Sequence, residues 1–290
     1  MSKLTKYIKR GLHYVIHGQP IIQMTPNIAI LTPNELLTGR TALITGGTRG
    51  IGRSIAEAFL NAGANVIITS RKLSDASTVA DELKEKYPLR RIWGIEMDSS
   101  NVEQIKCEFE KITKHIAPLE ISILVNNAGI LGGTLGRTSP DEFSKIIDTN
   151  LKGTFFLSEI TVSYMKSRQI SGNILMMASS SSLRPAISAY TISKWGLRGF
   201  ILGLAKACAP LGIIVNGIAP GPTATEMLGK DNVSDIYLES SPISRYALPE
   251  EIANMAIVLC SDMGKSIVGD IVYMTGGAGL ITFEDVKYNI

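Results

Sequence analysis

Seven short apolar runs rich in β-branched residues alternate with longer helical patterns from Thr41 onward, and this alternation constrains the fold more than any other feature of the sequence. The runs read TALIT, NVIITS, RIWGIEM, ISILVN, NILMMA, IIVNGI and DIVYM. Strands that alternate with helices favour a mostly parallel sheet whose two faces are both covered by helices. The sequence therefore predicts an α/β fold with a doubly wound, mostly parallel sheet of seven strands.

Apolar spacing and capping residues predict where individual helices begin and end. The apolar stripe of the first helix comprises Ile51, Ile55, Ala58, Phe59 and Ala62. Gly63 follows the stripe and is suited to close the helix in the left-handed conformation. Ser100 with Glu103, and Ser139 with Glu142, predict capping boxes that open two further helices.

Length and composition favour one large folded domain. Of the 290 residues, 45% are hydrophobic and 19% are charged, which is typical of a folded enzyme and excludes a disordered chain. No repeat, low-complexity tract or linker divides the β-α alternation. We expect an N-terminal extension over residues 1–38, a single domain over residues 39–283 and a tail over residues 284–290.

The N-terminal extension differs in character from the rest of the chain. Its first 34 residues hold four basic residues and no acid, which leaves 25 basic against 26 acidic groups in the remainder. A nearly neutral body without a nucleic-acid motif excludes a nucleic-acid binder. A short apolar stripe beside lysines is formed by Leu4, Ile8, Leu12 and Val15. Residues 1–20 could therefore make weak contact with a membrane surface. We favour the alternative, in which they pack on the protein's own domain or on a sister subunit.

Targeting and redox signals indicate a cytoplasmic protein without a metal. The apolar runs near the N-terminus are too short for a signal peptide, and no stretch reaches the ~20 residues of a membrane-spanning helix. Cys107, Cys208 and Cys260 lie far apart in apolar helical patterns, which favours reduced thiols. With three histidines scattered along the chain, no cluster of metal ligands forms.

Two motifs point to chemistry. The glycine-rich TGGTRGIG at 45–52 follows a predicted strand and opens a predicted helix, a context in which glycines and free helix N–H groups hold a pyrophosphate. Tyr190 and Lys194 lie four residues apart on one predicted helix face, where an ammonium group lowers the pKa of a phenol. An ordinary glycine turn and a surface Tyr–Lys pair are the alternatives for each motif taken alone.

These motifs, together with NNAG at 126–129, Asn150 and PGPTAT at 220–225, resemble a short-chain dehydrogenase/reductase of the single-domain, Rossmann-type class. The resemblance runs from about Thr41 to Gly279. It implies that Tyr190 is the general acid/base, that Lys194 supports it, that Ser179 orients the substrate oxygen and that Asn150 anchors a proton-relaying water. Ser179 precedes Tyr190 by 11 residues where the family usually has 12 or 13, and Ser180, Ser181 and Ser182 compete for its assignment.

The resemblance also implies a set of cofactor-binding residues, some of which the glycine motif indicates independently. The set comprises Gly46, Thr48, Arg49, Gly50, Ile51, Gly52, Ser70, Arg71, Asp98, Asn126, Ala128, Gly129, Tyr190, Lys194, Pro220, Gly221 and Thr225. Asp98 would accept a hydrogen bond from the adenine amine, and Thr225 would meet the nicotinamide carboxamide. Arg71 stands at the end of the second strand, where NAD enzymes carry an acid, so we favour NADP over NAD.

The sequence as a whole predicts an NADP-dependent reductase of a small ketone or aldehyde, or the reverse alcohol dehydrogenase. The resemblance implies a homodimer or homotetramer, with substrate walls from 131–138, 183–187 and the region after Thr225. Two alternatives stay open at this point. One is a nicotinamide-using epimerase or dehydratase, and the other is a catalytically silent NADP-binding scaffold or sensor.

Overall fold

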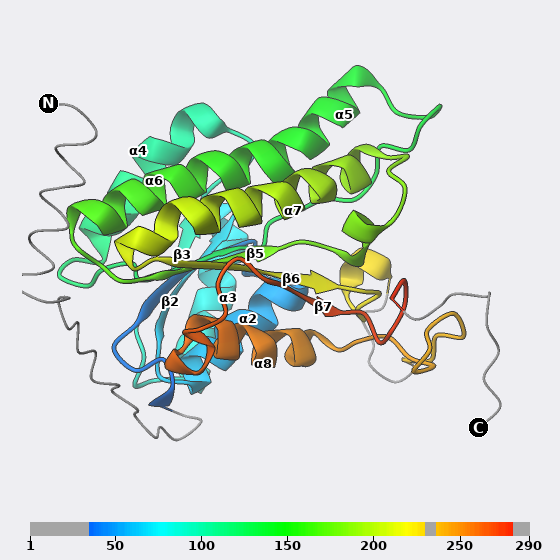
Figure 1. Cartoon of the computed structure of the whole chain (residues 1–290). Coiled ribbons are helices and arrows are strands. Elements are labelled where there is room, and N and C mark those ends of the chain that lie inside the picture. Colours follow the sequence, from blue (N-terminus) through cyan, green and yellow to red (C-terminus); the bar gives the residue numbers. More distant parts are fainter. Residues whose placement is uncertain (1–34, 230–235, 281–290) are drawn as a thin grey trace, which may run out of the picture. The chain divides into compact units, whose positions relative to one another are not determined.

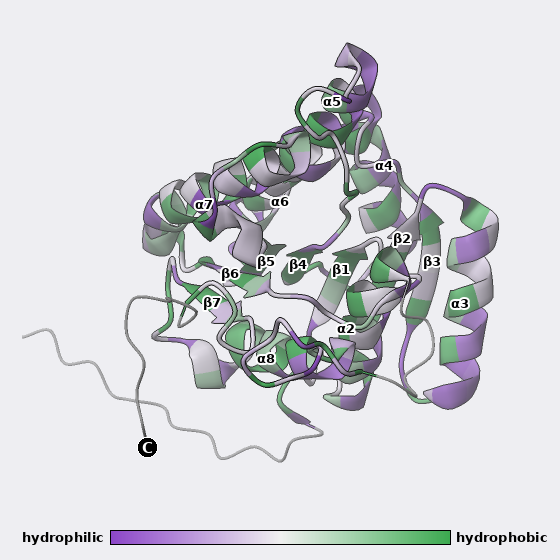
Figure 2. Cartoon of the chain, turned by 90° about the vertical axis from the view of Figure 1, so that its right-hand side faces the viewer, coloured by the Kyte–Doolittle hydropathy of each residue, from purple (hydrophilic) through white to green (hydrophobic). Residues whose placement is uncertain are grey.

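A sheet of seven strands in the order β3-β2-β1-β4-β5-β6-β7 forms the centre of the chain, and every neighbouring pair is parallel (Figures 1 and 2). The computed structural model describes residues 35–229 and 236–280, all within the unit Thr32–Ile290. The strands are β1 (Thr41–Thr45), β2 (Asn65–Ser70), β3 (Ile92–Glu96), β4 (Ile123–Asn126), β5 (Asn173–Met177), β6 (Ile214–Pro220) and β7 (Ile271–Met274). The predicted seven-stranded, doubly wound fold is confirmed.

Helices cover both faces of the sheet, as Figure 2 shows in an end-on view. One face carries α4 (Val102–His115), α6 (Gly153–Ser167) and α7 (Ala189–Cys208). The other carries α2 (Gly50–Asn61), α3 (Leu73–Lys86) and α8 (Pro249–Cys260). The short helix α5 (Pro140–Ile147) leads into α6 through the π-helical turn η2 (Asp148–Lys152).

The sheet separates two apolar cores, which explains why its strands read as unbroken apolar runs. Successive residues of a strand point to opposite faces. In β1, Ala42 and Ile44 join the core under α2, α3 and α8, whereas Leu43 joins the core under α4, α6 and α7. All five residues of β1 are buried, so neither face of this strand requires polar side chains.

Two predicted helix starts have different outcomes. Ser139 caps α5, because its hydroxyl accepts a hydrogen bond from the Glu142 N–H at 3.1 Å. The Ser100 cap is wrong: α4 begins at Val102 after Asn101, and both the N–H and hydroxyl of Ser100 bond to the Asp98 carboxylate instead. Asp98, which follows β3, therefore binds the Ser100 hydroxyl that would otherwise cap the helix.

The edges of the catalytic domain are described only in part. Leu37 is buried in the core and its N–H donates to the Ala62 carbonyl at 2.8 Å, so packing of this unit includes residues ahead of Thr41. The expected boundaries at 38 and 283 stay predictions. The basic stripe of residues 1–20 and the tail 284–290 lie outside the described residues. Within 35–229 and 236–280, no helix combines the length and hydropathy that a membrane crossing requires.

Candidate active site

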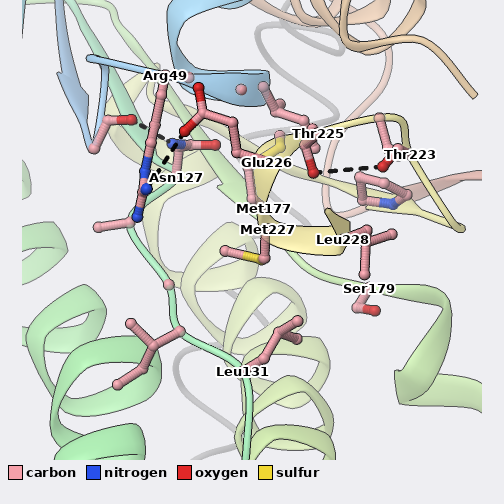
Figure 3. Close-up of a pocket in the computed structure, with 18 of the residues that line it drawn as sticks. Arg49, Asn127, Leu131, Met177, Ser179, Thr223, Thr225, Glu226, Met227 and Leu228 are labelled. Carbon is pink, nitrogen blue, oxygen red and sulfur yellow. Dashed lines mark hydrogen bonds and ion pairs between the residues drawn. The ribbon is translucent and has the colours of Figure 1, made fainter. Parts of the chain in front are cut away.

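A cleft of about 1030 Å³ opens at the carboxyl ends of the parallel strands (Figure 3). It lies where β1 pairs with β2 on one side and with β4 on the other, which is the point at which the strand order reverses. Such switch points form crevices in doubly wound sheets. The cleft joins the β1–α2 turn to the ends of the other central strands.

The β1–α2 turn is shaped to hold an anion. Gly46 and Gly50 adopt φ values of 64° and 52°, which side chains with a Cβ rarely adopt. A Cβ on Gly52 would collide with the Gly46 carbonyl oxygen, so α2 approaches the turn as closely as glycine allows. Arg49 precedes α2 without capping it through its side chain, and the first turn holds no acid, which leaves helix N–H donors free for phosphate.

Asn127 and Thr45 brace this turn, and sequence reasoning did not single out either residue. The Asn127 amide donates to the carbonyl oxygens of Thr45 and Gly46 at 2.9 and 3.1 Å. The Thr45 hydroxyl accepts from the backbone N–H groups of Asn127 and Ala128, both at 3.0 Å. Asn127 could have been identified from the sequence, because it is the second asparagine of the NNAG motif. The bracing fixes the glycine turn against the end of β4.

The cleft brings together most of the predicted site residues. Those that line it are Gly46, Thr48, Arg49, Gly50, Ile51, Gly52, Ser70, Arg71, Asp98, Ala128, Gly129, Ser179, Tyr190, Pro220, Gly221 and Thr225. Three predicted residues, Asn126, Asn150 and Lys194, do not line it. The Asn126 amide bonds to the Ser158 hydroxyl at 2.9 Å and so ties β4 to α6, behind the cleft.

Asn150 lies at the centre of the π-helical turn and uses its whole side chain within the protein. Its Oδ1 accepts from the Ile130 N–H at 2.8 Å, and its Nδ2 donates to the Ile130 carbonyl and to Ser193 at 3.0 and 3.1 Å. A π-turn inserts one residue into a helix and often marks a functional position. Here it directs the amide inward, where it connects the segment after β4 to α7.

Tyr190 and Ser179 form the polar centre of the cleft. Burial raises the pKa of Tyr190, while its hydrogen bond with Ser179 lowers the pKa by a smaller amount. Ser179 also accepts from the Ser181 N–H at 3.1 Å, and Ser182 is turned away with its hydroxyl on the Ser179 carbonyl. The run of serines forms the turn η3 (Ser180–Leu183), and Ser179 is the member that contacts Tyr190.

Lys194 lies behind Tyr190 and is buried. Its Nζ donates to the Met177 carbonyl oxygen at 2.6 Å and stands 5.6 Å from the centroid of the Tyr190 ring. Burial lowers the pKa of Lys194 to about 8. The expected lowering of the Tyr190 pKa is therefore reversed in direction, because burial of the phenol outweighs the influence of its neighbours.

Arg71 and Arg49, both predicted to bind the cofactor, differ in their contacts. Arg71 and Ser70 line the cleft at the end of β2, together with Lys72 and Asp75. Arg49 instead faces Glu226, with Nη1 and Oε2 3.4 Å apart and both side chains more than half exposed (Figure 3). Pairs this exposed contribute little stability, so the Arg49 contact is readily exchanged.

The opposite end of the cleft is mostly apolar. Leu131, Met177, Met227 and Leu228 project around the opening in Figure 3, and Ser179 lies beside them. Of the predicted walls, 131–138 contributes Leu131 alone and 183–187 contributes Arg184 alone, whereas the region after Thr225 contributes Glu226, Met227, Leu228, Leu238, Ser240 and Tyr246. Met177, at the end of β5, also lines this part of the cleft and was missed by sequence reasoning.

Comparison with known proteins gives concordant matches. Residues 40–235 match the family model described as short chain dehydrogenase. A 3-oxoacyl-(acyl-carrier-protein) reductase of Aquifex aeolicus is 36% identical over 246 residues, covering 83% of this chain and 98% of the relative.

Two solved structures are also similar. A short chain dehydrogenase of Burkholderia cenocepacia in complex with NADP superposes with a TM-score of 0.75 and 29% identity, covering 84% of this chain and 99% of the other. The L-sorbose reductase of Gluconobacter frateurii, complexed with NADPH and L-sorbose, has a TM-score of 0.76 and 29% identity, covering 85% and 99%.

Proposed function

This chain belongs to the short-chain dehydrogenase family and is an oxidoreductase acting on CH–OH and C=O groups; from that premise we propose that it is an NADP-dependent reductase of a small carbonyl compound, with Tyr190 as the proton donor. The observation that carries the proposal is the Ser179–Tyr190 hydrogen bond inside the cleft that also holds the glycine turn.

The protonated phenol of Tyr190 suits the role of proton donor in the reductive direction. A bound NADPH would supply the hydride for the carbonyl carbon. Tyr190 donates its proton to the carbonyl oxygen, and the phenolate regains a proton from solvent. Because burial raises the pKa of Tyr190, the phenol is protonated at neutral pH and available as the acid. The Ser179 hydroxyl orients the same oxygen from the end of β5.

Lys194 and Asn150 support Tyr190 from behind the cleft. A Cβ on Gly129 would stand 3.4 Å from Asn150 Oδ1 and 3.8 Å from Lys194 Nζ. Gly129 therefore lies beside both of these polar groups. A protonated Lys194 would stabilise the phenolate that forms when Tyr190 has given up its proton.

NADP is favoured over NAD by the charge at the end of β2. The guanidinium of Arg71 is suited to bind the 2′-phosphate. Arg49, which is part of the glycine turn and lines the same cleft, provides a second guanidinium for this phosphate. The free helix N–H groups of α2 fit the pyrophosphate, and Asp98 retains one carboxylate oxygen for the adenine amine because Ser100 contacts only Oδ1. Similar structures bound to NADP and NADPH support the same choice.

We also propose that the chain forms a homodimer or homotetramer through α6 and α7 and acts in the cytoplasm. Large apolar side chains are exposed on these helices, among them Phe155, Phe156 and Leu202. The burial of such side chains in a subunit interface would account for their exposure here.

The proposal is tested by Tyr190→Phe, measured as NADPH oxidation with a panel of ketones and aldehydes. We expect turnover to fall by about 10²- to 10⁴-fold, the usual contribution of a positioned acid. NADPH binding, followed by its fluorescence, should be retained. Tyr87→Phe, which removes a hydroxyl outside the cleft, is the matched control. Equal turnover by wild type and Tyr190→Phe would overturn the mechanism.

A further inference from the structure

The substrate end of the cleft holds a cation that the reductase mechanism does not use. Arg184 lines the cleft together with Leu131, Met227, Leu228 and Leu238. The other cations lining it, Arg49, Arg71 and Lys72, come from the β1–α2 and β2–α3 turns at the cofactor end. Arg184 comes from the segment between β5 and α7, which also carries Ser179 and Tyr190.

The backbone of Arg184 is held in place. Its N–H donates to the Ser181 carbonyl at 3.2 Å, and its carbonyl accepts from the Trp195 indole N–H at 2.8 Å. These two bonds tie the residue to η3 and to α7. The backbone position of Arg184 at the rim of the cleft is therefore fixed, and only its side chain can change conformation.

Among the described residues, none pairs with the guanidinium of Arg184. In the part of the chain that the structure describes, no carboxylate lies within 4.0 Å of Arg184 and no acceptor bonds to its side chain. Glu226, an acid that lines the cleft, faces Arg49 instead. Arg184 is exposed, and Gly279 lies beside its guanidinium, because a Cβ at Gly279 would stand 3.8 Å from Nε.

We propose that Arg184 binds a carboxylate of the substrate, so that the enzyme reduces an oxo acid whose carbonyl and carboxylate are separated by an apolar segment. This inference rests on the proposed reductase function and adds the substrate class. A guanidinium presents paired donors that match a carboxylate, and the apolar residues beside it suit an apolar segment between the two ends of the substrate. Ser179 and Tyr190 then receive the carbonyl oxygen while Arg184 holds the far end.

The test compares oxo acids of increasing chain length with their methyl esters, using NADPH oxidation by the full chain. For the best chain length, wild type should show kcat/KM about tenfold or more higher for the acid than for the ester, as a charge-assisted contact at a partly exposed site provides. The preference should fall as ionic strength rises, because salt screens the pair.

Arg184→Gln should lower kcat/KM for the acid about tenfold more than for the ester, mainly through KM. Arg137→Gln removes the same charge from an exposed residue that does not line the cleft, and it should retain the acid preference. Circular dichroism compares the folding of both variants with wild type.

The outcomes separate the two proposals. If the wild type turns over esters as fast as acids, with no effect of salt, the proposed role of Arg184 is overturned while the reductase function stands. These measurements use the wild type, so they decide the question even if Arg184→Gln does not fold. Equal losses on acid and ester in a folded Arg184→Gln would overturn it as well. An absence of NADPH oxidation with every compound would overturn the reductase function and this inference with it.

Discussion

Lys194 Nζ donates a hydrogen bond to the backbone carbonyl oxygen of Met177 at 2.6 Å, so the ammonium group is directed at the end of β5. The contact is buried, and burial lowers the pKa of Lys194 to about 8 while it raises that of Tyr190. Both shifts favour the neutral side chains. The pair is therefore arranged to keep the phenol protonated until a substrate oxygen accepts its proton.

Lys194→Met should stabilise the protein at pH 7 and lose that advantage in alkali. The shift of the Lys194 pKa from its usual 10.5 to about 8 corresponds to roughly 3 kcal/mol. Below pH 8 the folded state holds a buried charge at this cost. As pH rises from 8 towards 10.5, the folded state binds fewer protons than the unfolded state, so the wild type gains stability. The lost Met177 bond offsets part of the gain, which leaves about 1–2 kcal/mol at pH 7.

Urea unfolding of wild type and Lys194→Met at pH 7 and pH 10 measures this difference. Lys206→Met, on the exposed side of α7, removes the same charge without burial and serves as the control. A gap between wild type and Lys194→Met that is the same at both pH values would contradict the buried-charge explanation.

Arg71→Ala should weaken NADPH binding much more than NADH binding. A guanidinium at the 2′-phosphate contributes about 1.5–3 kcal/mol, or roughly 10- to 150-fold in Kd, whereas NADH lacks that phosphate. Fluorescence titration of both nucleotides gives the ratio. Arg91→Ala, which alters an exposed arginine outside the cleft, should leave both affinities unchanged. Similar losses for the two nucleotides would show that Arg71 does not select between them.

Glu226→Gln should tighten NADPH binding, because it releases Arg49 from the 3.4 Å ion pair. The expected gain is about two- to fivefold, in keeping with an exposed pair, and it should be smaller for NADH. Isothermal titration calorimetry of the two nucleotides at low salt measures the effect. Glu82→Gln, whose carboxylate pairs with Arg53 on α2, controls for the loss of an exposed acid. Weaker NADPH binding by Glu226→Gln would assign Glu226 a direct role at the nucleotide.

Gly52→Ala and Gly203→Ala should have opposite effects on stability. The Cβ at position 52 would collide with the Gly46 carbonyl and the Asn127 amide, and overpacking of this kind costs about 1–3 kcal/mol. The Cβ at position 203, on the exposed side of α7, meets nothing within 4 Å, and alanine there should stabilise the helix by roughly 0.5–1 kcal/mol. Chemical denaturation of both variants provides the comparison; destabilisation by Gly203→Ala would point to a partner on α7.

Features that depend on neighbouring residues could be predicted from the sequence. The strand TALIT is recognisable because its side chains alternate between two cores and all are apolar or small enough to be buried. The glycines at 46 and 50 are recognisable because a turn between a strand and a helix requires their positive φ values. The Ser179–Tyr190 contact followed from motif order, and the turn η3 accommodates the shortened spacing.

Features that depend on burial or on distant partners required the folded chain. Lys194 contacts a carbonyl 17 residues away and Arg49 pairs with an acid 177 residues away, and no local pattern specifies either partner. Asn126 and Asn127 are the same residue type, yet the pleat of β4 and the turn after it direct the first to α6 and the second to the glycine turn. The direction of the Tyr190 pKa shift also required the folded chain, because desolvation depends on all the residues that pack around the phenol. Spacing along a helix specifies only one neighbour of Tyr190, namely Lys194.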